Sequence, residues 1–387
     1  MKYRLDELFD LQMGKTPSRN NPEYWDSEDH KWISIGDLSK CGKYICETRE
    51  YLSDKAVAES GISQIPANTV IMSFKLSIGK TAITPEPMYS NEAIMSFRDK
   101  RVVPLLPDYI FYMFSGRDWD AGTNKAVMGK TLNKATLSQI KIRVHSLPEQ
   151  QKIVRVLDKT AAIIEARQKE LQKLDELVKA RFVEMFGDPV SNSHRLPEAT
   201  LPELGEFGRG ISKHRPRNDP KLLGGEYPLI QTGDVAAANL YITSYDSTYS
   251  ELGLKQSKMW DKGTLCITIA ANIAKTAILD FDACFPDSVV GFTANKKTNN
   301  IFIHYWFSFF QAILESQAPE SAQKNINLKI LSELRVIVPE KTEQDEFVNF
   351  VKQIDKSKVV ESIHRMNVLF NITLNGGNRY DIRANEF

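Results

Sequence analysis

Cysteine and long apolar runs are both scarce in this sequence. The four cysteines, Cys41, Cys46, Cys266 and Cys284, have neither CxxC spacing nor a nearby histidine pair, which favours ordinary reduced thiols over a metal site. No stretch approaches the roughly 18 apolar residues of a membrane-spanning helix. The N-terminal residues MKYRLDELFDLQ carry charges where a signal peptide needs an apolar core. We therefore expect a cytoplasmic protein that has no membrane partner.

Net charge is nearly absent as well. The chain has 50 Lys and Arg residues against 49 Asp and Glu residues, which gives a formal net charge of +1. No global field therefore attracts nucleic acid, and a DNA-binding surface must come from local clusters of charge. With 387 residues, of which 42% are hydrophobic and 26% charged, the chain is globular and long enough for two or three cores.

Recognisable catalytic motifs are also missing. Three GKT tripeptides begin at Gly14, Gly79 and Gly129, but none has the upstream glycine of a phosphate-binding GxxxxGK[ST] loop. The NPEY segment at residues 21–24 is similar to the NPPY motif of adenine methyltransferases, yet glutamate replaces the second proline and no glycine-rich cofactor loop precedes it. The six histidines are scattered, without an HExxH or nucleophile-histidine-acid pattern. We expect no catalytic residue, no metal and no cofactor.

Proline and glycine are absent from two long segments. The first lies between Pro148 and Gly187, and its apolar residues recur mainly at intervals of seven, which predicts a helix of more than thirty residues, roughly 50 Å long. The second, residues 342–372, repeats the Glu-Gln pair of the first at its entrance, and its apolar row shifts by one residue towards its end. We predict that the two helices pack antiparallel; the alternative is two unrelated core helices. The seam residues are Ile153, Leu157, Ile164, Leu171, Leu174, Val178, Phe347, Val351, Ile354, Ile363 and Met366.

An internal duplication precedes each helix. The alternating segments 32–38 and 227–235 both contain Gly-Asp, which predicts a strand that ends in a turn. The segments IGKTAI (78–83) and IAKTAI (273–278) predict hairpin strands, and the aromatic segments 109–114 and 302–310 predict helices. The segments 137–144 and 328–338 lead into the long helices. The order is globular unit, helix, globular unit, helix, which predicts an α+β fold with a pseudo-twofold axis.

This order resembles the specificity subunits of type I restriction-modification enzymes. The motifs that carry the resemblance are the entrances LPEQQKIVRVLD and PEKTEQDEFVNFVKQID, the paired Gly-Asp segments, IGKTAI and IAKTAI, and the strand-helix joints. The resemblance implies two α/β target-recognition domains, at 1–148 and 188–338, separated by two long antiparallel helices at 149–187 and 339–374. The tail, 375–387, continues a polar ending unlike the helical one typical of this family.

Basic and polar loops are the candidate DNA-binding residues. Arg and Lys suit phosphates and guanine, Asn and Gln suit adenine, and Ser or Thr suits either. Any single one of these side chains could instead be merely solvated. In the first unit the candidates are Lys15, Thr16, Ser18, Arg19, Lys75, Ser77, Lys80, Lys130 and Asn133. In the second they are Arg209, Lys213, Arg215, Arg217, Gln231, Asn272, Lys275, Lys324 and Asn325.

These patterns predict a non-catalytic DNA-specificity subunit. Each target-recognition domain would read one half of a bipartite site in double-stranded DNA, and the helices would set the spacing. The resemblance further implies two modification (methyltransferase) subunits docked on the helical region, whose seam residues form the partner-binding set, and two motor-nuclease restriction subunits that complete the complex. Two alternatives stay open: a nucleic-acid-modifying enzyme that acts alone, and a protein-binding scaffold.

Overall fold

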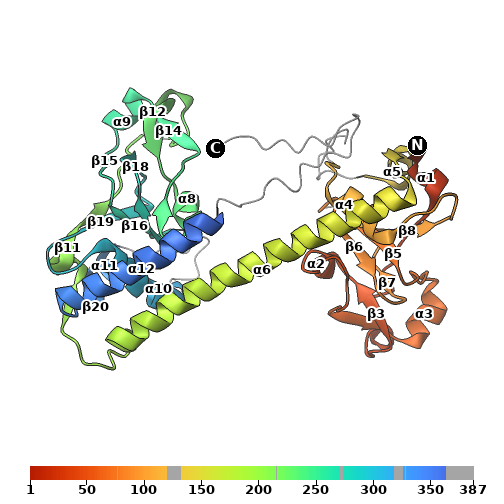
Figure 1. Cartoon of the computed structure of the whole chain (residues 1–387), viewed down its shortest axis with the longest axis horizontal. Coiled ribbons are helices and arrows are strands. Elements are labelled where there is room, and N and C mark those ends of the chain that lie inside the picture. Colours follow the sequence, from red (N-terminus) through yellow and green to blue (C-terminus); the bar gives the residue numbers. More distant parts are fainter. Residues whose placement is uncertain are drawn as a thin grey trace. The chain divides into compact units, whose positions relative to one another are not determined.

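The computed structural model describes residues 1–75, 77–119, 132–214, 216–270, 273–317, 326 and 328–362. The chain divides into two compact units, which we call the N-terminal lobe (Met1–Arg167) and the C-terminal lobe (Gln168–Ser362) (Figure 1). In the described part, no helix combines the length and the apolar character needed to cross a membrane.

The N-terminal lobe contains two small sheets and a two-stranded ribbon. The first sheet, in the order β2-β8-β5-β6, is antiparallel, and the second has the order β4-β3-β7. The strands are β1 (Lys2–Arg4), β2 (Phe9–Met13), β3 (His30–Ile33), β4 (Glu50–Leu52), β5 (Thr69–Ser73), β6 (Thr81–Thr84), β7 (Tyr89–Ser90), β8 (Ile94–Asp99) and β9 (Lys141–Arg143). The helices are α1 (Leu5–Leu8), η1 (Pro22–Tyr24), α2 (Ile35–Leu38), α3 (Asp54–Ser60), α4 (Pro107–Ser115) and α5 (Lys134–Gln139). The ribbon is formed by β1 and β9.

The C-terminal lobe repeats this plan. Its sheets have the orders β11-β19-β16-β17-β13 and β14-β12-β18-β15, and β10 and β20 form its ribbon. The strands are β10 (Glu198–Thr200), β11 (Gly205–Arg209), β12 (Leu223–Leu229), β13 (Tyr241–Ile242), β14 (Ser247–Tyr249), β15 (Met259–Trp260), β16 (Leu265–Thr268), β17 (Thr276–Leu279), β18 (Ala283–Cys284), β19 (Val289–Ala294) and β20 (Arg335–Ile337). The helices are α7 (Leu201–Leu204), η2 (Pro220–Leu222), α8 (Thr232–Ala237), α9 (Glu251–Lys255), α10 (Asn300–Gln317) and α11 (Leu328–Glu333).

The duplication extends to single backbone contacts. The parallel bridge between Tyr44 and Ile83 in the N-terminal lobe corresponds to the parallel pairing of β13 with β17 in the C-terminal lobe. The predicted internal repeat and the α+β class are therefore confirmed. The alternation of β5 explains how one strand serves two cores, because Val70 and Met72 pack towards α4 whereas Ile71 packs against a separate cluster that contains Ile33.

One local prediction from the repeat is wrong. Gly36-Asp37 and Gly233-Asp234 do not form turns after a strand, because they lie inside the short helices α2 and α8. The Ser34 amide donates to Asp37 Oδ2 at 2.9 Å, and the Gln231 amide donates to Asp234 Oδ2 at 2.7 Å. Each aspartate thus caps a helix start, as in a capping box.

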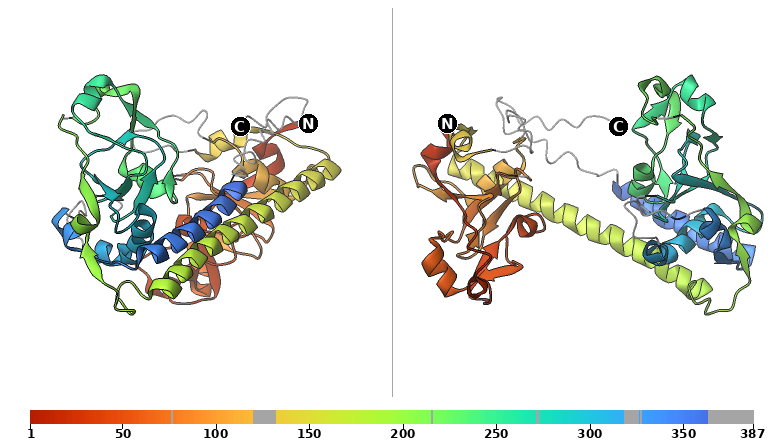
Figure 2. Two further views of the ribbon diagram at one scale, coloured as in Figure 1. Left: turned by 60° about the vertical axis from the view of Figure 1, so that its left-hand side comes forward. Right: turned by 180° about the vertical axis from the view of Figure 1, so that it is seen from behind.

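The long helix α6 spans Leu147–Phe186, and α12 spans Lys341–Ser362. Figures 1 and 2 show α12 running antiparallel beside the C-terminal part of α6, within the C-terminal lobe. Their contact centres on aromatic rings, with the Phe182 ring centroid 5.3 Å from that of Phe347 and the Phe186 centroid 5.7 Å from it. Arg181 and Glu346 form an ion pair at 3.0 Å beside these rings.

The predicted seam residues fall into three groups. Val178, Phe347 and Val351 are buried in the core of the C-terminal lobe, and Ile354 packs against that core. Ile153 packs against the core of the N-terminal lobe instead of a second helix. Half-buried residues follow between these positions: Leu157, Ile164, Leu171 and Leu174. Ile363 and Met366 lie outside the described residues. Within the described residues, α12 therefore packs against the C-terminal end of α6.

Buried glutamines attach both helices to their lobes. Gln150 is fully buried; its Nε2 donates to Pro104 O at 2.9 Å and to His145 O at 3.0 Å, and its Oε1 accepts from the Leu106 amide at 3.0 Å. Gln344 is equally buried and binds Lys297 O, Pro339 O and Thr298 Oγ1. Because each glutamine satisfies groups on the loop before the helix and on the preceding lobe, it fixes the direction in which the helix leaves.

A charged network adds a second attachment in the N-terminal lobe. Lys43 Nζ lies 2.6 Å from Asp108 Oδ1 on α4 and 2.6 Å from Asp158 Oδ1 on α6. Tyr112 donates to the same Asp158 oxygen at 2.6 Å, and Tyr44 donates to Asp108 at 2.8 Å. The side chain of Lys43 therefore joins the lobe to α6 two helical turns after Gln150.

Candidate nucleic-acid interface

A glycine marks the start of the basic loop in each lobe. A Cβ atom on Gly14 would lie 2.2 Å from the carbonyl oxygen of Ser90, and one on Gly210 would lie 2.2 Å from that of Phe285. The backbone leaves β2 and β11 so close to the second sheet that any side chain would clash. The loops therefore begin at equivalent, tightly fixed points.

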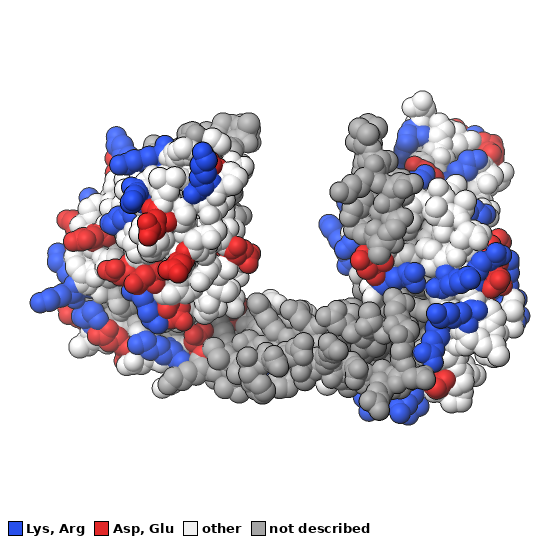
Figure 3. All heavy atoms as spheres, turned by 90° about the horizontal axis from the view of Figure 1, so that it is seen from above, with Lys and Arg blue, Asp and Glu red and all other residues white. Residues whose placement is uncertain are grey.

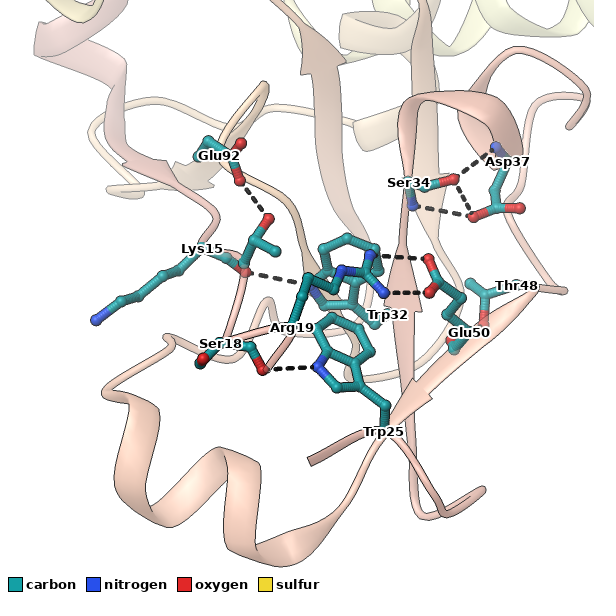
Figure 4. A network of polar contacts seen from close by, with 11 residues as sticks. Lys15, Ser18, Arg19, Trp25, Trp32, Ser34, Asp37, Thr48, Glu50 and Glu92 are labelled. Carbon is teal, nitrogen blue, oxygen red and sulfur yellow. Dashed lines mark hydrogen bonds and ion pairs between the residues drawn. The ribbon is translucent and has the colours of Figure 1, made fainter. Parts of the chain in front are cut away.

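Aromatic residues hold the loop of the N-terminal lobe, as Figure 4 shows. Trp32 Nε1 donates to Lys15 O at 3.1 Å, and Trp25 Nε1 donates to Ser18 O at 3.1 Å. The guanidinium of Arg19 stacks 3.7 Å from the centroid of the Trp25 ring and pairs through both terminal nitrogens with Glu50. The hydrogen bond from Arg19 to Glu50 raises the pKa of Arg19 above its ordinary value. The loop backbone is thereby fixed before any ligand arrives.

These contacts divide the four candidates in this loop. Arg19 is occupied by Glu50 and Trp25, and Thr16 donates to Glu92, whose pKa this hydrogen bond lowers. The exposed Lys15 ammonium donates to Ser60 O at 2.5 Å, and the side chain of Ser18 is exposed. The side chains of Lys15 and Ser18 are therefore the more accessible ones in this loop. Those of Arg19 and Thr16 hold the loop in place through their acidic partners.

The IGKTAI and IAKTAI segments form matched turns between strands. The Lys80 amide donates to Ser73 Oγ at 3.0 Å, and the Lys275 amide donates to Thr268 Oγ1 at 3.1 Å. The residue before each lysine is left-handed, with φ +86° at Gly79 and +56° at Ala274. The Lys80 side chain is exposed and that of Lys275 is half-buried. Ser77 is exposed in the first turn, and Lys75 lies 5.3 Å from the Phe74 ring centroid.

A cavity of about 820 Å³ opens beside the turn of the N-terminal lobe. Its lining includes Lys80, Arg117 and Trp119, together with Tyr112 of α4. Burial lowers the pKa of Arg117, and its guanidinium lies 5.2 Å from the Trp119 ring centroid. The cavity thus brings the cations Lys80 and Arg117 together with the aromatic rings of Trp119 and Tyr112. Such rings can stack on flat polar groups.

Different residues hold the loop of the C-terminal lobe. Gln256 Oε1 accepts from the amides of Lys213 at 2.7 Å and His214 at 3.0 Å, and Ser257 donates to Ile211 O at 2.8 Å. Arg217 forms an ion pair with Asp287 at 2.5 Å. The side chains of Arg209 and Lys213 are exposed, and no ion pair joins either of them to a described carboxylate.

The remaining candidates are helix caps or lie beyond the described residues. Asn133 caps α5 by accepting from the Thr136 amide at 2.8 Å, and the exposed Gln231 immediately precedes α8. Outside the described residues lie Lys130, Arg215, Asn272, Lys324 and Asn325. Within the described part of the chain, no group of three or more His, Cys, Asp or Glu side chains is placed to hold a metal ion.

The sequence did not reveal the residues that support the loops. Trp25, Trp32, Glu50 and Gln256 act from other segments, and nothing in their local sequence marks them. The NPEY segment has a structural use, because Asn21 Oδ1 accepts from the Glu23 amide and caps η1. The two lobes therefore share a framework but differ in the residues that shape and surround their loops.

A duplicated sheet framework with lobe-specific polar loops, each lobe followed by a helix, defines the class of protein. The chain belongs to the family described as "Type I restriction modification DNA specificity domain", which matches residues 1–176 and 198–367. The resemblance found in the sequence is confirmed.

Individual relatives agree with this family. The chain is 28% identical over 189 residues to the type I restriction enzyme MjaIX specificity subunit of Methanocaldococcus jannaschii, covering 48% of this chain and 43% of that protein. It is 29% identical over 178 residues to the EcoR124I/EcoR124II specificity subunit of Escherichia coli, covering 43% of each. The matched part thus spans less than half the length of these two relatives.

Solved structures share the fold over nearly the whole chain. One is the S subunit of a type I restriction-modification system from M. genitalium, with a TM-score of 0.52 at 14% identity, covering 97% of this chain and 94% of that one. Another comes from a study of complex assembly and conformational transition of the type I R-M system, with a TM-score of 0.55 at 15% identity and coverage of 95% and 93%. At this identity the likeness concerns the fold alone.

Proposed function

We propose that this chain is the DNA sequence-specificity subunit of a type I restriction-modification complex. Each lobe reads one half of a bipartite target in double-stranded DNA, and the helices set the spacing between the halves. The observation that carries the proposal is the family match over both lobes, joined to a fold that repeats the same framework twice.

The difference between the lobes supports reading of two unlike half-sites. Base edges are recognised by individual side chains, whereas phosphate contacts only position the protein. In the N-terminal lobe the accessible candidates are Lys15, Ser18, Ser77 and Lys80, and in the C-terminal lobe they are Arg209, Lys213, Gln231 and Lys275. Arg19 and Thr16 act in this proposal by holding their loop, and Arg217 has the same role through Asp287.

The helix α6 supports the spacing role. Its 40 residues form one uninterrupted helix, about 60 Å long at a rise of 1.5 Å per residue. It begins in the N-terminal lobe, where Gln150 and Asp158 attach it, and ends in the C-terminal lobe, where Phe182 and Phe186 enter the core. Attachment at both ends of a continuous helix transmits a fixed length better than a flexible linker does.

The surface of α6 also supports docking of the modification subunits. Val156, Ile163 and Leu177 are 51%, 54% and 47% exposed, which is high for apolar residues. Val156, Ile163 and Leu177 immediately precede the seam residues Leu157, Ile164 and Val178, of which the first two are half-buried and the third is buried. The exposed row thus follows the same seven-residue interval as the seam, with Glu170 at its third position. In this proposal the chain recognises the target sequence and two methyltransferase subunits methylate adenine within it. Motor-nuclease subunits complete the restriction complex.

A binding assay with the assembled complex tests the proposal. The complex of this chain and its modification subunits should retard a duplex that carries the methylated target and should bind a scrambled duplex of the same composition more weakly. Double charge reversal, Arg209→Glu with Lys213→Glu, should abolish this preference, whereas Lys262→Glu, at an exposed lysine paired with Asp280 at 2.8 Å, should leave it unchanged. Equal affinity of the wild-type complex for both duplexes overturns the proposal.

A further inference from the structure

The ribbon of the N-terminal lobe presents an unusual arrangement of charge. In the antiparallel pairing of β1 with β9, Lys2 lies directly opposite Arg143, and Arg4 lies directly opposite Lys141. Directly opposite residues share a face of the ribbon, so all four cations lie on one side. Between them, Ile142 is buried and Tyr3 packs against the lobe core, which makes the basic side the outer one. We call these four residues the basic ribbon.

Among the residues that the structure describes, three of these four cations form no ion pair. Arg4 Nε lies 3.0 Å from Asp6 Oδ1 and 3.6 Å from Glu7 Oε1. Lys2, Lys141 and Arg143 are exposed, and among the described residues no carboxylate forms an ion pair with any of them. Directly opposed like charges destabilise a strand pair. The arrangement therefore costs folding stability unless an anion lies against it.

The equivalent ribbon of the C-terminal lobe lacks this feature. There Glu198 lies opposite Ile337, and Thr200 lies opposite Arg335. The backbone pairing is the same in both lobes, so the framework does not require the cations. Figure 3 shows one face of each lobe: Lys and Arg predominate on the pictured face of the N-terminal lobe (right), whereas that of the C-terminal lobe (left) mixes both signs.

We propose that the basic ribbon binds the phosphate backbone of duplex DNA outside the bases read by the loops. A protein partner fits less well, because protein interfaces have a core depleted of charge and enriched in aromatic side chains, and the outer side of this ribbon carries only cations. DNA presents a continuous row of phosphates, which a rigid row of cations can neutralise without reading sequence. The inference rests on the proposed function only in choosing DNA as the polyanion.

The position of the ribbon separates it from the reading loop. The chain passes from β1 through α1 and the five residues of β2 before it reaches Gly14. A strand of that length spans about 17 Å, which corresponds to roughly 5 base pairs at 3.4 Å each. The ribbon therefore contacts flanking DNA and contributes affinity without changing the recognised bases.

Salt dependence of binding to a non-target duplex tests the proposal. Each phosphate contact adds about 0.9 to the slope of log K against log salt concentration, so the double variant Lys141→Gln with Arg143→Gln should lower the slope by about 1.8. The matched control, Arg335→Gln on the equivalent strand of the C-terminal lobe, should leave it unchanged. The charge-retaining pair Lys141→Arg with Arg143→Lys should keep the wild-type slope.

The outcomes separate this proposal from the proposed function. Because opposed like charges are removed, the double glutamine variant should melt no lower than wild type, so weaker DNA binding in it reports lost contacts. A slope equal to wild type in that variant overturns the basic ribbon as a DNA site, even when target preference is intact. Loss of assembly with the modification subunits at an unchanged slope also overturns it, because the ribbon then docks protein. A lower slope without any target preference supports the ribbon and refutes the sequence-reading function.

Discussion

Phe182 is one of the buried residues, with Val178 and Phe186, through which α6 enters the core of the C-terminal lobe. It is fully buried, and its ring centroid lies 5.0 Å from that of Phe186, 5.3 Å from Phe302, 5.2 Å from Phe309 and 5.3 Å from Phe347. Truncating a buried phenylalanine to alanine removes its transfer free energy and leaves a cavity, which together cost about 3–5 kcal/mol. We therefore predict that Phe182→Ala strongly destabilises the packing of α6 against α10 and α12.

Hydrogen exchange resolves this effect by segment. Since about 1.4 kcal/mol corresponds to a factor of ten, the amides of α10 and α12 should exchange faster in Phe182→Ala than in wild type, by a factor of roughly 100 to 4,000. Amides of β5 in the N-terminal lobe should be unaffected. Val183→Ala is the matched control, because Val183 is 40% exposed and such surface changes stay within about 0.5 kcal/mol. Equal protection of α10 and α12 in both variants refutes the reasoning.

Three further predictions concern the attachments and the loop. Gln344→Leu leaves three hydrogen-bond partners unsatisfied, Thr298 Oγ1 and Pro339 O in buried contacts and Lys297 O in a partly buried one. It should cost about 2–4 kcal/mol in urea unfolding; a loss below about 0.5 kcal/mol shows that water replaces the amide. Burial acts to raise the pKa of Asp108, but hydrogen bonds from Lys43 and Tyr44 outweigh it, so this pKa lies below its ordinary 3.8. The stability that this carboxylate contributes is therefore present above pH 3.8 and lost as the pH falls through its folded pKa. The difference in melting temperature between wild type and Lys43→Met should have its full size near about pH 6 and become smaller below about pH 4. A difference that does not change with pH contradicts the ion pair between Lys43 and Asp108. Gly14→Ala should cost about 1–3 kcal/mol through its clash with the neighbouring sheet, whereas Gly42→Ala, which meets nothing within 4 Å, should be neutral in the same thermal melt.

The strands and helices of the framework could be predicted from the sequence because they depend on local periodicity. Alternation in β5, the missing Pro and Gly of α6, and the repeated Glu-Gln entrance all report contacts that recur at fixed spacing. The short helices at Asp37 and Asp234 could also have been recognised, since Ser34 stands three residues before Asp37 in a capping-box arrangement. A Gly-Asp pair alone predicts a turn, whereas both pairs lie in short helices.

The contacts that sequence reasoning missed are long-range. Phe182 does not belong to the row of apolar residues at seven-residue intervals. The end of α6 packs against several elements of the C-terminal lobe at once, in a core rich in aromatic residues, and not against a single helix. Glu50 reaches Arg19 across 31 positions, and Gln256 reaches Lys213 across 43. No local spacing encodes such pairs. For the same reason the sequence predicts Arg19 as a DNA-contacting residue without indicating that its guanidinium pairs with Glu50 and stacks on Trp25.

Mapping methylated adenines across the host genome tests the central claim most directly. A reader built from two lobes on one continuous helix should yield a single motif made of two unlike half-sites, separated by a constant number of unread base pairs. One uninterrupted motif, or half-sites whose separation varies from locus to locus, contradicts the account.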